Sequence, residues 1–441
     1  PLVLSAALPE DHDFDAVVVL DAESSPLAAV LPALTRCRQV IAFGDPHLGR
    51  PQPFTVAPTA APAPGAHPVV EVDSAFDALS RVVPERTLRT VHRSMDEGVF
   101  RYLDEQFYGG RLRRLPHGES VTGAVPALSV EYVPDGVGAL TAGIEGIQAP
   151  AAEVRRVVAL VFEHAARHPR RSLAVVTASA VHASRIAEAV RRRMREEPAT
   201  AAFFAPGPES FRVVDLHRAA GIVRDTVIFS LGFGKTANGR TVPYLGALSE
   251  RHGRQAFVLA MTRARHTTRI VTSLHPEEVE AKGLQHGARD FARVLAMHLG
   301  AGAAPGEGAR RTHEDALVVD LARRLAERGA SVRLHHAGAV DLVAWADTES
   351  MSAGAVLDGR TRAAGRPLRI PVAGQSDGSA EAAALSVRER SRLRPQQLER
   401  TGWNYLTLWT IEVFTDPDTV ADLIRRDLGL PTGPERGSRA R

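Results

Sequence analysis

The sequence contains very few cysteine, lysine and aromatic residues. Among its 441 residues there is one cysteine, Cys37, the lysines are Lys235 and Lys282, and aromatic residues make up 5%. A single cysteine excludes an internal disulfide framework and a thiolate metal site, and it suits a reducing cytoplasm. The 17 histidines show no spacing typical of a zinc site. Disulfide-rich secreted domains and zinc proteins are therefore excluded.

Long apolar runs are also missing. No stretch approaches the roughly 20 apolar residues that a membrane-spanning helix needs, and the acidic, broken start PLVLSAALPEDHDFD is unlike a signal peptide. We therefore expect a cytoplasmic protein without membrane contact. Because the sequence enters almost directly into a strand, we expect it to be a piece of a longer protein. Its length allows two or three domains, and its oligomeric state is left open.

Two apolar runs near the start are separated by a helical pattern. The first, Phe14 to Asp21, closes on an acid, and the second, Gln39 to Phe43, is followed by Gly44-Asp45-Pro46. Two strands joined by a helix predict a parallel βαβ unit, in which the carboxyl ends of the strands meet. Aspartates at these ends can hold a magnesium ion beside a nucleotide. A single aspartate there would be a strand-end cap, but the pair favours a site.

A second α/β unit follows. The pattern predicts helices over Ala151 to His168 and Ala180 to Arg195, and it predicts strands over Ser172 to Thr177, Arg212 to Val214, Thr226 to Leu231 and Arg269 to Val271. The last strand is preceded by an apolar segment that ends in Thr262-Arg263-Ala264-Arg265. Two arginines in a turn have no obvious structural purpose, and their planar, permanently charged forks suit a phosphate.

A glycine-rich loop, GFGKT at Gly232 to Thr236, superficially suggests a phosphate-binding loop. The Walker A pattern requires a further glycine at the position of Phe229, and the residues after the loop do not predict a helix. We therefore conclude that this chain contains no Walker A motif. We expect that the chain by itself does not hydrolyse ATP.

A third segment follows a Gly/Ala/Pro-rich linker. The pattern predicts a helix over His313 to Arg328 and strands over Ser331 to His336, Val340 to Ala346, Ala355 to Asp358 and Tyr405 to Thr410. A charged helix, SVRERSRLRPQQLERTG, carries Arg390, Arg392 and Arg394, which either face nucleic-acid phosphates or form a solvated surface. Trp403 and Trp409 are predicted to be core residues rather than base-stacking groups.

An ordered series of short motifs spans roughly the first two-thirds of the chain. In order, the motifs are LDAES, FGDPHLGRPQPF, LRTVHRS, VVDLHRAAGIVRDTVIFS and AMTRAR. Their order, spacing and flanking strands resemble the later motifs of superfamily 1 helicases, in the branch of the nonsense-decay helicases. The resemblance implies an α/β fold of RecA-like domains, with residues 1–80 as the last part of the first domain and residues 81–300 as the second.

The same resemblance implies roles for individual residues. The implied catalytic residues are Glu23, Arg93 and Arg263. The implied nucleotide-binding residues are Asp21, Gly44, Asp45, Gly221 and Arg265, with Asp21 also a magnesium ligand and Thr262 a nucleic-acid contact. Some positions depart from the family pattern. The Walker B glutamate is shifted by one position to Glu23, and Leu48, Ala220 and Val223 replace polar coupling residues.

The third segment has a resemblance of its own. Residues 312–431 resemble a restriction-endonuclease-like domain related to very-short-patch repair enzymes. That resemblance implies Glu314, Asp341 and Asp358 around a divalent metal at a scissile phosphate. Val356 replaces an expected glutamate and no lysine follows, so the sequence predicts a degenerate site with a DNA-binding or structural role. Residues 301–311 are predicted to be a linker, and residues 432–441 a disordered tail.

Together these features predict part of an ATP-dependent superfamily 1 helicase or translocase. ATP and Mg²⁺ are the implied cofactors, and nucleic acid is the implied partner, with DNA preferred over RNA. Two alternatives stay open. One is a non-catalytic nucleic-acid-binding scaffold in which motor and nuclease have decayed, and the other is a metal-dependent DNA nuclease that uses Asp341 and Asp358.

Overall fold

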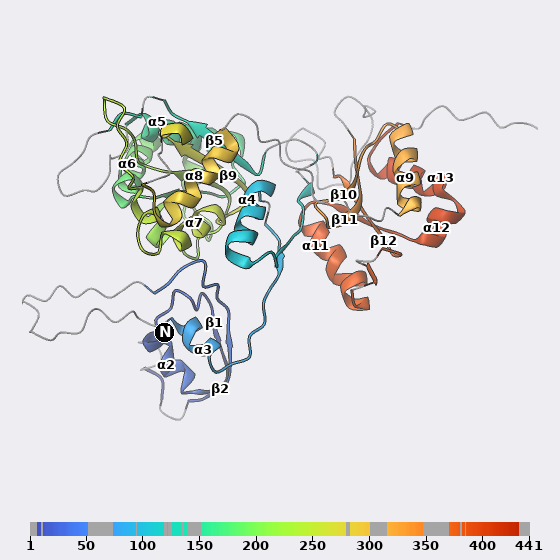
Figure 1. Cartoon of the computed structure of the whole chain (residues 1–441), viewed down its shortest axis with the longest axis horizontal. Coiled ribbons are helices and arrows are strands. Elements are labelled where there is room, and N and C mark those ends of the chain that lie inside the picture. Colours follow the sequence, from blue (N-terminus) through green and yellow to red (C-terminus); the bar gives the residue numbers. More distant parts are fainter. Residues whose placement is uncertain are drawn as a thin grey trace, which may run out of the picture. The chain divides into compact units, whose positions relative to one another are not determined.

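The computed structural model (Figure 1) describes residues 7–9, 12–51, 74–93, 95–118, 121, 126–134, 136–138, 151–278, 283–299, 315–346, 370–379, 382–383 and 385–431. Its contacts divide the chain into two compact units. The first unit contains Pro1–Leu88 and Leu128–Ala303, and the second contains Arg89–Ala127 and Ala304–Arg441. Both units are α/β. The predicted linker 301–311 and tail 432–441 lie outside the described residues.

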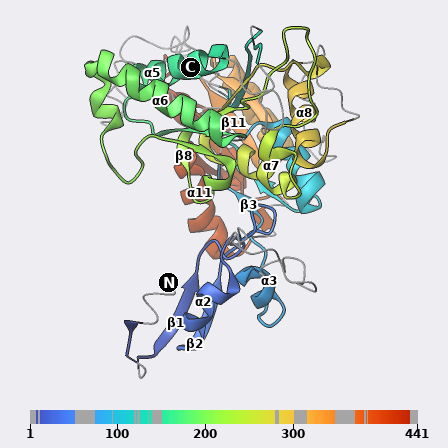
Figure 2. The same ribbon diagram turned by 90° about the vertical axis from the view of Figure 1, so that its left-hand side faces the viewer.

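The predicted βαβ unit is confirmed. Strand β1 (Phe14–Val19) pairs in parallel with β2 (Cys37–Ala42), α2 (Leu27–Leu34) connects them, and α3 (Ala75–Ser80) follows. Figure 2 shows α2 beside the two strands. The two strands are only partly buried. One face packs against α2 and α3, whereas Leu20 is 66% exposed and Phe43 is 48% exposed on the strand ends.

The larger part of the first unit contains a five-stranded parallel sheet. The strand order is β5-β9-β8-β6-β7, and the strands are β5 (Leu128–Tyr132), β6 (Leu173–Thr177), β7 (Arg212–Asp215), β8 (Arg224–Ser230) and β9 (Ala264–Thr272). The helices are α5 (Ala151–Arg167), α6 (Ala180–Glu196), α7 (Gly253–Met261) and α8 (His286–Leu299). Short 3₁₀ turns lie at η3 (Pro198–Phe204), η4 (Leu216–Arg218), η5 (Gly246–Leu248) and η6 (Pro276–Glu278).

The predicted helices and strands of this sheet are confirmed, and apolar periodicity explains them. Val157 and Val161 on α5 are four residues apart and therefore lie on one face, as do Ile186 and Val190 on α6. These side chains are buried against the sheet. Residues 173–176 of β6 are fully buried, as expected for a parallel strand that is covered on both faces.

The second unit contains a four-stranded mixed sheet in the order β10-β11-β12-β13. The strands are β10 (Ser331–His336), β11 (Val340–Trp345), β12 (Val372–Ser376) and β13 (Asn404–Leu408); the first two pairings are antiparallel and the last is parallel. The helices are α9 (Ala316–Glu327), the π-helix η7 (Glu389–Leu393), α11 (Arg394–Arg400), α12 (Thr410–Thr415) and α13 (Pro417–Asp427). The sequence does not predict β12, and the predicted strand at residues 355–358 lies outside the described residues.

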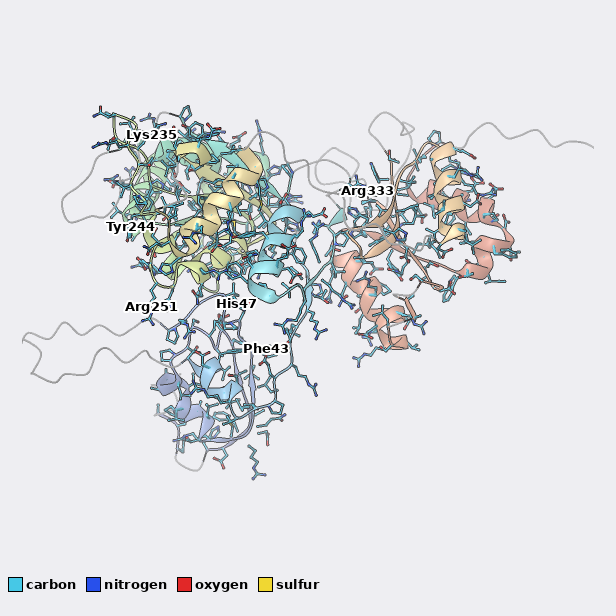
Figure 3. All side chains as sticks on the ribbon, viewed as in Figure 1. Phe43, His47, Lys235, Tyr244, Arg251 and Arg333 are labelled. Carbon is cyan, nitrogen blue, oxygen red and sulfur yellow. The ribbon has the colours of Figure 1, made fainter. Side chains whose placement is uncertain are left out.

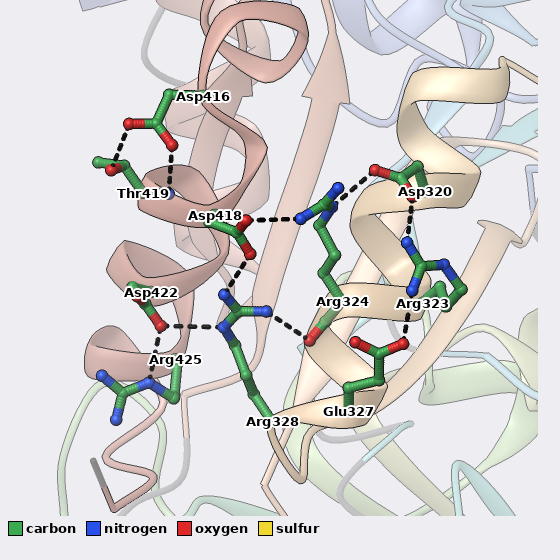
Figure 4. Close-up of polar contacts among 10 residues, drawn as sticks. All are labelled: Asp320, Arg323, Arg324, Glu327, Arg328, Asp416, Asp418, Thr419, Asp422 and Arg425. Atoms are coloured by element: carbon green, nitrogen blue, oxygen red, sulfur yellow. Dashed lines mark hydrogen bonds and ion pairs between the residues drawn. The ribbon is translucent and has the colours of Figure 1, made fainter. Parts of the chain in front are cut away.

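Helices α9 and α13 are joined by an ion-pair network on their outer faces (Figure 4). Arg328 donates from Nη2 to Asp418 at 2.6 Å and from Nε to Asp422 at 2.9 Å, while Arg324 contacts Asp320 and Asp418. Asp418 is 60% exposed and Asp422 48% exposed, so water screens these pairs and each adds little stability. Apolar packing beneath the helices, including Leu321, is the main stabilising contribution.

Residues 89–127 pack with the second unit. They form β3 (Thr90–Val91), β4 (Arg113–Arg114), α4 (Glu97–Leu103) and the π-helix η1 (Asp104–Tyr108). The sequence motifs predict one domain over residues 81–300, whereas the contacts group residues 89–127 with the carboxy-terminal segment. The reason is burial: Leu115 and Val121 join the core of Val343 and Trp403, and Trp403 Nε1 donates to the Pro116 carbonyl at 2.7 Å.

The two tryptophans of this unit have different environments. Trp403 is 2% exposed, which confirms it as a core residue. Trp409 is 50% exposed, so its prediction as a core residue is wrong. Trp409 follows the last residue of β13 and precedes α12, where the chain leaves the sheet, and its neighbour Ile411 is 70% exposed.

Candidate nucleotide and metal sites

Three predicted acidic residues lie at the carboxyl ends of β1 and β2. Asp21 has a left-handed backbone (φ 50°), and its carbonyl accepts hydrogen bonds from the hydroxyls of Ser24 and Ser25 at 3.0 and 3.2 Å. This turn directs Glu23 inward, where it is 6% exposed. The backbone N–H of Asp45 donates to Glu23 Oε2 at 3.2 Å. The structure therefore brings Glu23 and Asp45 together.

Burial changes the acidity of Glu23. Desolvation raises its pKa, the backbone N–H groups of Glu23 and Asp45 lower it, and the charges of Asp21 and Asp45 raise it further. A carboxylate with a raised pKa suits proton transfer near neutral pH. Gly44 is required beside it, because an added Cβ would lie 2.6 Å from Phe76 Cδ2 and 3.0 Å from Glu23 Oε2.

The chemistry of these oxygens fits magnesium, but they do not form a complete metal site. In the described residues, no group of three or more His, Cys, Asp or Glu side chains could hold a metal ion. Magnesium in nucleotide sites usually takes one or two carboxylates and fills its other positions with water and phosphate oxygens. Asp21 and Asp45 can supply that smaller number.

Arg263 lies where α7 meets β9 and is 5% exposed. Its Nε donates to the Leu259 carbonyl at 3.2 Å, and its Nη2 donates to Thr262 Oγ1 at 2.9 Å. The backbone N–H of Arg224 donates to the Arg263 carbonyl at 3.3 Å. The motif-bearing segments Val213–Ser230 and Ala260–Arg265 therefore meet on neighbouring strands, β8 and β9.

Arg265 has carboxylate partners in its own unit. Its guanidinium binds Glu209, with Nη1 to Oε2 at 2.8 Å, and Asp225 Oδ1 at 3.0 Å. The hydrogen bonds from Arg265 to Glu209 lower the pKa of Glu209 to about 2. Arg265 is thus a structural link, which makes Arg263 the stronger candidate for a phosphate contact. Gly221 adopts φ +74° in the turn before β8, a conformation that favours glycine.

Arg93 belongs to the other compact unit. It is half-buried in the segment Arg89–Ala127, whose contacts are grouped with the carboxy-terminal residues. Arg263 lies in the first unit. The structure therefore does not place these two predicted catalytic arginines in one unit, and their joint role stays a prediction.

The glycine-rich loop after β8 has a structural role. Figure 3 labels Lys235 on this loop. Lys235 forms an ion pair with Glu278, and its Nζ donates to the hydroxyl of Tyr132 at 3.2 Å. The hydrogen bond to Glu278 raises the pKa of Lys235. Its ammonium joins the loop to η6, in agreement with the rejection of a Walker A motif.

In the second unit, Asp341 is the centre of a buried polar cluster. Asp341 is 5% exposed, and its Oδ2 accepts from Gln375 Nε2 at 2.6 Å and from the Ser376 N–H at 2.9 Å. Ser376 Oγ donates to Asp315 Oδ2 at 3.0 Å. The side-chain oxygen of Gln375 is buried without a hydrogen-bond partner in the described part of the chain. The two other predicted metal ligands of this segment, Glu314 and Asp358, lie outside the described residues.

The predicted nucleic-acid arginines of the second unit differ in exposure. Arg390 and Arg392 are exposed on η7. Arg394 is half-buried and its Nη2 donates to the Ala339 carbonyl. Arg394 therefore helps to attach α11 to the sheet, and Arg390 and Arg392 are better placed to meet a phosphate.

Comparisons with known proteins show no family. No family model matches the chain, and no curated protein matches it. One solved structure, the C-terminal domain of a possible DNA helicase from Lactobacillus plantarum WCFS1, is 14% identical with a TM-score of 0.22. The match covers 44% of this chain and 91% of that one. A TM-score of this size does not establish a shared fold. No described helix combines the length and apolar character needed to cross a membrane.

Sequence reasoning missed Gln375 and Asp315. Both depend on β12, whose five residues, VAGQS, include a glycine and two polar side chains and therefore lack a strand pattern. The signal that could have found them is the proline and glycine that bracket this short segment, Pro371 and Gly378. Pairing of β12 with β11 then brings Gln375 beside Asp341.

Proposed function

We propose that this chain is part of an ATP-dependent superfamily 1 helicase or translocase that acts on nucleic acid, with ATP between two RecA-like domains. The observation that carries the proposal is the position of Arg263. It lies nearly buried at the α7–β9 junction, and its carbonyl is hydrogen-bonded to Arg224 at the start of β8. Two motif segments that are separate in sequence are thereby adjacent, and the parallel sheet supports both.

In this proposal, each residue has a defined task. Arg263 stabilises negative charge on the transferred phosphoryl group, a contribution of about a thousandfold or more in phosphoryl-transfer enzymes. Glu23, whose pKa is raised by burial, accepts a proton from the attacking water. Asp21 and Asp45 would hold the magnesium that accompanies ATP, and hydrolysis of the bound ATP would supply the free energy for movement.

The departures from the family pattern predict weak coupling between nucleotide and nucleic acid. Ala220 is exposed and Val223 is half-buried in the turn between η4 and β8, and neither side chain can donate a hydrogen bond. Leu48 lacks polar atoms as well. We therefore propose a slow motor rather than an efficient one.

Nucleotide-dependent binding of nucleic acid tests the proposal. The affinity of the 441-residue chain for a fluorescein-labelled single-stranded DNA would be measured by anisotropy, with and without a magnesium complex of a non-hydrolysable ATP analogue. We expect the nucleotide to change the affinity about 5-fold, and Arg263→Ala to abolish the change. Arg254→Ala serves as the control, because Arg254 lies on α7, the helix that precedes Arg263, and is 48% exposed.

Two outcomes would favour the scaffold alternative. One is salt-dependent DNA binding that the nucleotide does not change in the wild-type chain. The other is an equal nucleotide effect in wild type and Arg263→Ala. Hydrolysis of ATP by the chain alone, lost in Arg263→Ala, would refute the expected inactivity while strengthening the family assignment.

A second candidate function is metal-dependent cleavage of DNA by the second unit. The cluster of Asp341, Gln375 and Asp315 supports it, because buried oxygen ligands near two carboxylates suit a divalent cation. A nuclease should nick supercoiled plasmid in Mg²⁺ or Mn²⁺, and Asp341→Asn should reduce nicking about 100-fold or more. Asn keeps an oxygen that can accept from Ser376. Equal rates in wild type and Asp341→Asn would exclude this function.

A further inference from the structure

The edge of the five-stranded sheet at which the strands begin carries an excess of positive charge. Helices α5 and α6 both end at this edge, because each returns the chain from the end of one parallel strand to the start of the next. The stretch from residue 163 to residue 197 contains eight arginines and four glutamates, and no aspartate or lysine. The whole chain has a net charge of only +3, so this excess is local.

Much of this charge is not neutralised by the protein. Arg167 and Arg193 form ion pairs within their helices. Four exposed arginines make no ion pair in the part of the chain that the structure describes, and we call them the edge arginines: Arg170, Arg191, Arg192 and Arg195. A cation in the last turn of a helix offsets the helix dipole. That effect accounts for Arg195, which lies in the last turn of α6, but not for the other three.

A pocket opens on this side of the unit, and of the edge arginines Arg170 contributes to its lining. It has a volume of about 230 Å³, and its lining includes Arg170, Phe203, Phe211, Glu209 and Asp225. Phe203 belongs to η3, which is separated from α6 by one residue, Glu197. The Phe203 ring is half-buried and packs edge-to-face against Phe204, with ring centroids 5.2 Å apart. The pocket thus combines aromatic walls, a cation at its rim and two carboxylates.

We propose that this edge binds single-stranded nucleic acid, with phosphates on the edge arginines and one base in the pocket beside Phe203. Arginines suit phosphate oxygens, an aromatic ring suits a base face, and carboxylates can accept from an exocyclic amino group. An anionic membrane fits less well, because membrane-binding helices insert large apolar side chains. On α6 the exposed large apolar residue is Val181, at the end of the helix remote from the edge arginines.

The first arm of the test reverses the charge. The triple variant Arg191→Glu, Arg192→Glu, Arg195→Glu of the full chain would be titrated against a fluorescein-labelled single-stranded 20-mer over a range of salt. We expect about 10-fold or greater weakening and a salt slope that is smaller by about 2, since each phosphate contact on a single strand contributes about 0.7. The control is Arg155→Glu, an exposed arginine near the start of α5, which should stay within about twofold of wild type.

The second arm fills the pocket. Ala202 is exposed and lines the pocket, so Ala202→Trp adds bulk without removing a core side chain. It should weaken binding of the normal 20-mer about 5-fold or more and leave binding of an abasic oligonucleotide unchanged. Circular dichroism verifies that the variants fold. Equal affinity of wild type and triple variant for the 20-mer overturns the proposal, as does an equal effect of Ala202→Trp on both probes.

Binding to anionic vesicles tests whether this edge binds a membrane surface instead of nucleic acid. A membrane surface would replace the proposal if the wild-type chain binds phosphatidylserine vesicles as tightly as the 20-mer and the triple variant loses both kinds of binding equally. The inference rests on the proposed function only in taking nucleic acid as the ligand. If the nucleotide does not change the DNA affinity of the wild-type chain but the edge variants weaken binding as expected, the proposed function alone is refuted. If the nucleotide effect depends on Arg263 but the edge variants bind like wild type, this inference alone is refuted.

Discussion

Replacing Glu153 with alanine should lower the free energy of unfolding of the five-stranded unit by about 3–5 kcal/mol. Glu153 is fully buried in the first turn of α5, at the carboxyl ends of the strands. Its Oε1 accepts from Ser230 Oγ at 2.6 Å and from the Gly232 N–H at 2.9 Å, and its Oε2 accepts from Ser273 Oγ at 2.8 Å. The alanine variant leaves three buried donors without their acceptor.

Urea denaturation of the full chain measures the effect. The control is Glu163→Ala on the same helix: its carboxylate is 36% exposed and pairs with Arg167 on the surface, so it should cost about 0.5 kcal/mol. Glu153→Gln keeps the shape of the side chain but turns an amide donor toward other donors. Its loss of unfolding free energy should lie between those of Glu153→Ala and Glu163→Ala. An alanine variant within about 1 kcal/mol of wild type would show that water replaces the carboxylate.

The same cluster contains a serine, a histidine and a carboxylate, yet its geometry excludes a catalytic triad. His182 Nε2 lies 2.7 Å from Ser230 Oγ, but Glu153 accepts from Ser230 instead of orienting the other ring nitrogen, as a triad requires. His182 Nδ1 is buried without a hydrogen-bond partner in the described residues. Ser230 is fully buried, so no substrate can reach its hydroxyl. The cluster joins α5, α6 and the ends of β8 and β9.

Acidification should destabilise the second unit through His336. Burial lowers the pKa of His336 to about 4, with smaller contributions from Arg333 and Arg114. In the unfolded chain the ordinary value is 6.5. Between these two values the unfolded state takes up a proton that the native state refuses, so stability falls as the pH decreases from about 6.5 to about 4. The expected loss is about 3 kcal/mol, at 1.36 kcal/mol per pKa unit.

His336→Phe provides the matched comparison. The His336 ring lies edge-on to Trp403 with centroids 5.9 Å apart, a contact that phenylalanine can preserve. Denaturation midpoints would be compared across this pH range. On acidification, the variant should lose about 3 kcal/mol less unfolding free energy than wild type. The plots of unfolding free energy against pH should be parallel for the two proteins above pH 6.5 and below pH 4. Parallel pH profiles throughout would show that His336 titrates normally in the folded protein.

Local sequence patterns were sufficient for most elements of the first unit. The strands around Phe14, Thr226 and Arg269 and the helices that start at Ala151 and Ala180 follow from apolar periodicity, which depends only on neighbours in the chain. The acidic residues at the ends of β1 and β2 follow from the same logic. Parallel strands joined by a helix bring their carboxyl ends together, so a meeting of Asp21 and Asp45 at this edge was predicted. The contact that the structure shows is that of Glu23 with the Asp45 N–H.

Exposure and packing partners were not predictable in the same way. Trp409 and Trp403 differ by six positions in similar apolar surroundings, but only Trp403 meets Leu115 and Val121 from a distant part of the chain. The same long-range contacts place residues 89–127 with the carboxy-terminal segment. No local pattern contains that information, because burial depends on which other segment covers a side chain.

The candidate sites show the same difference between what local sequence and tertiary structure determine. The sequence by itself determined which side chains can do chemistry, and it singled out Arg263, Glu23 and Asp341. Only the tertiary structure decided their partners: Arg263 donates to the Leu259 carbonyl and to Thr262, the Asp45 N–H donates to Glu23, and Gln375 donates to Asp341. The physical reason is that periodicity is a property of neighbouring residues, whereas hydrogen bonding, desolvation and pKa depend on groups that only strand pairing and helix packing bring within a few ångströms.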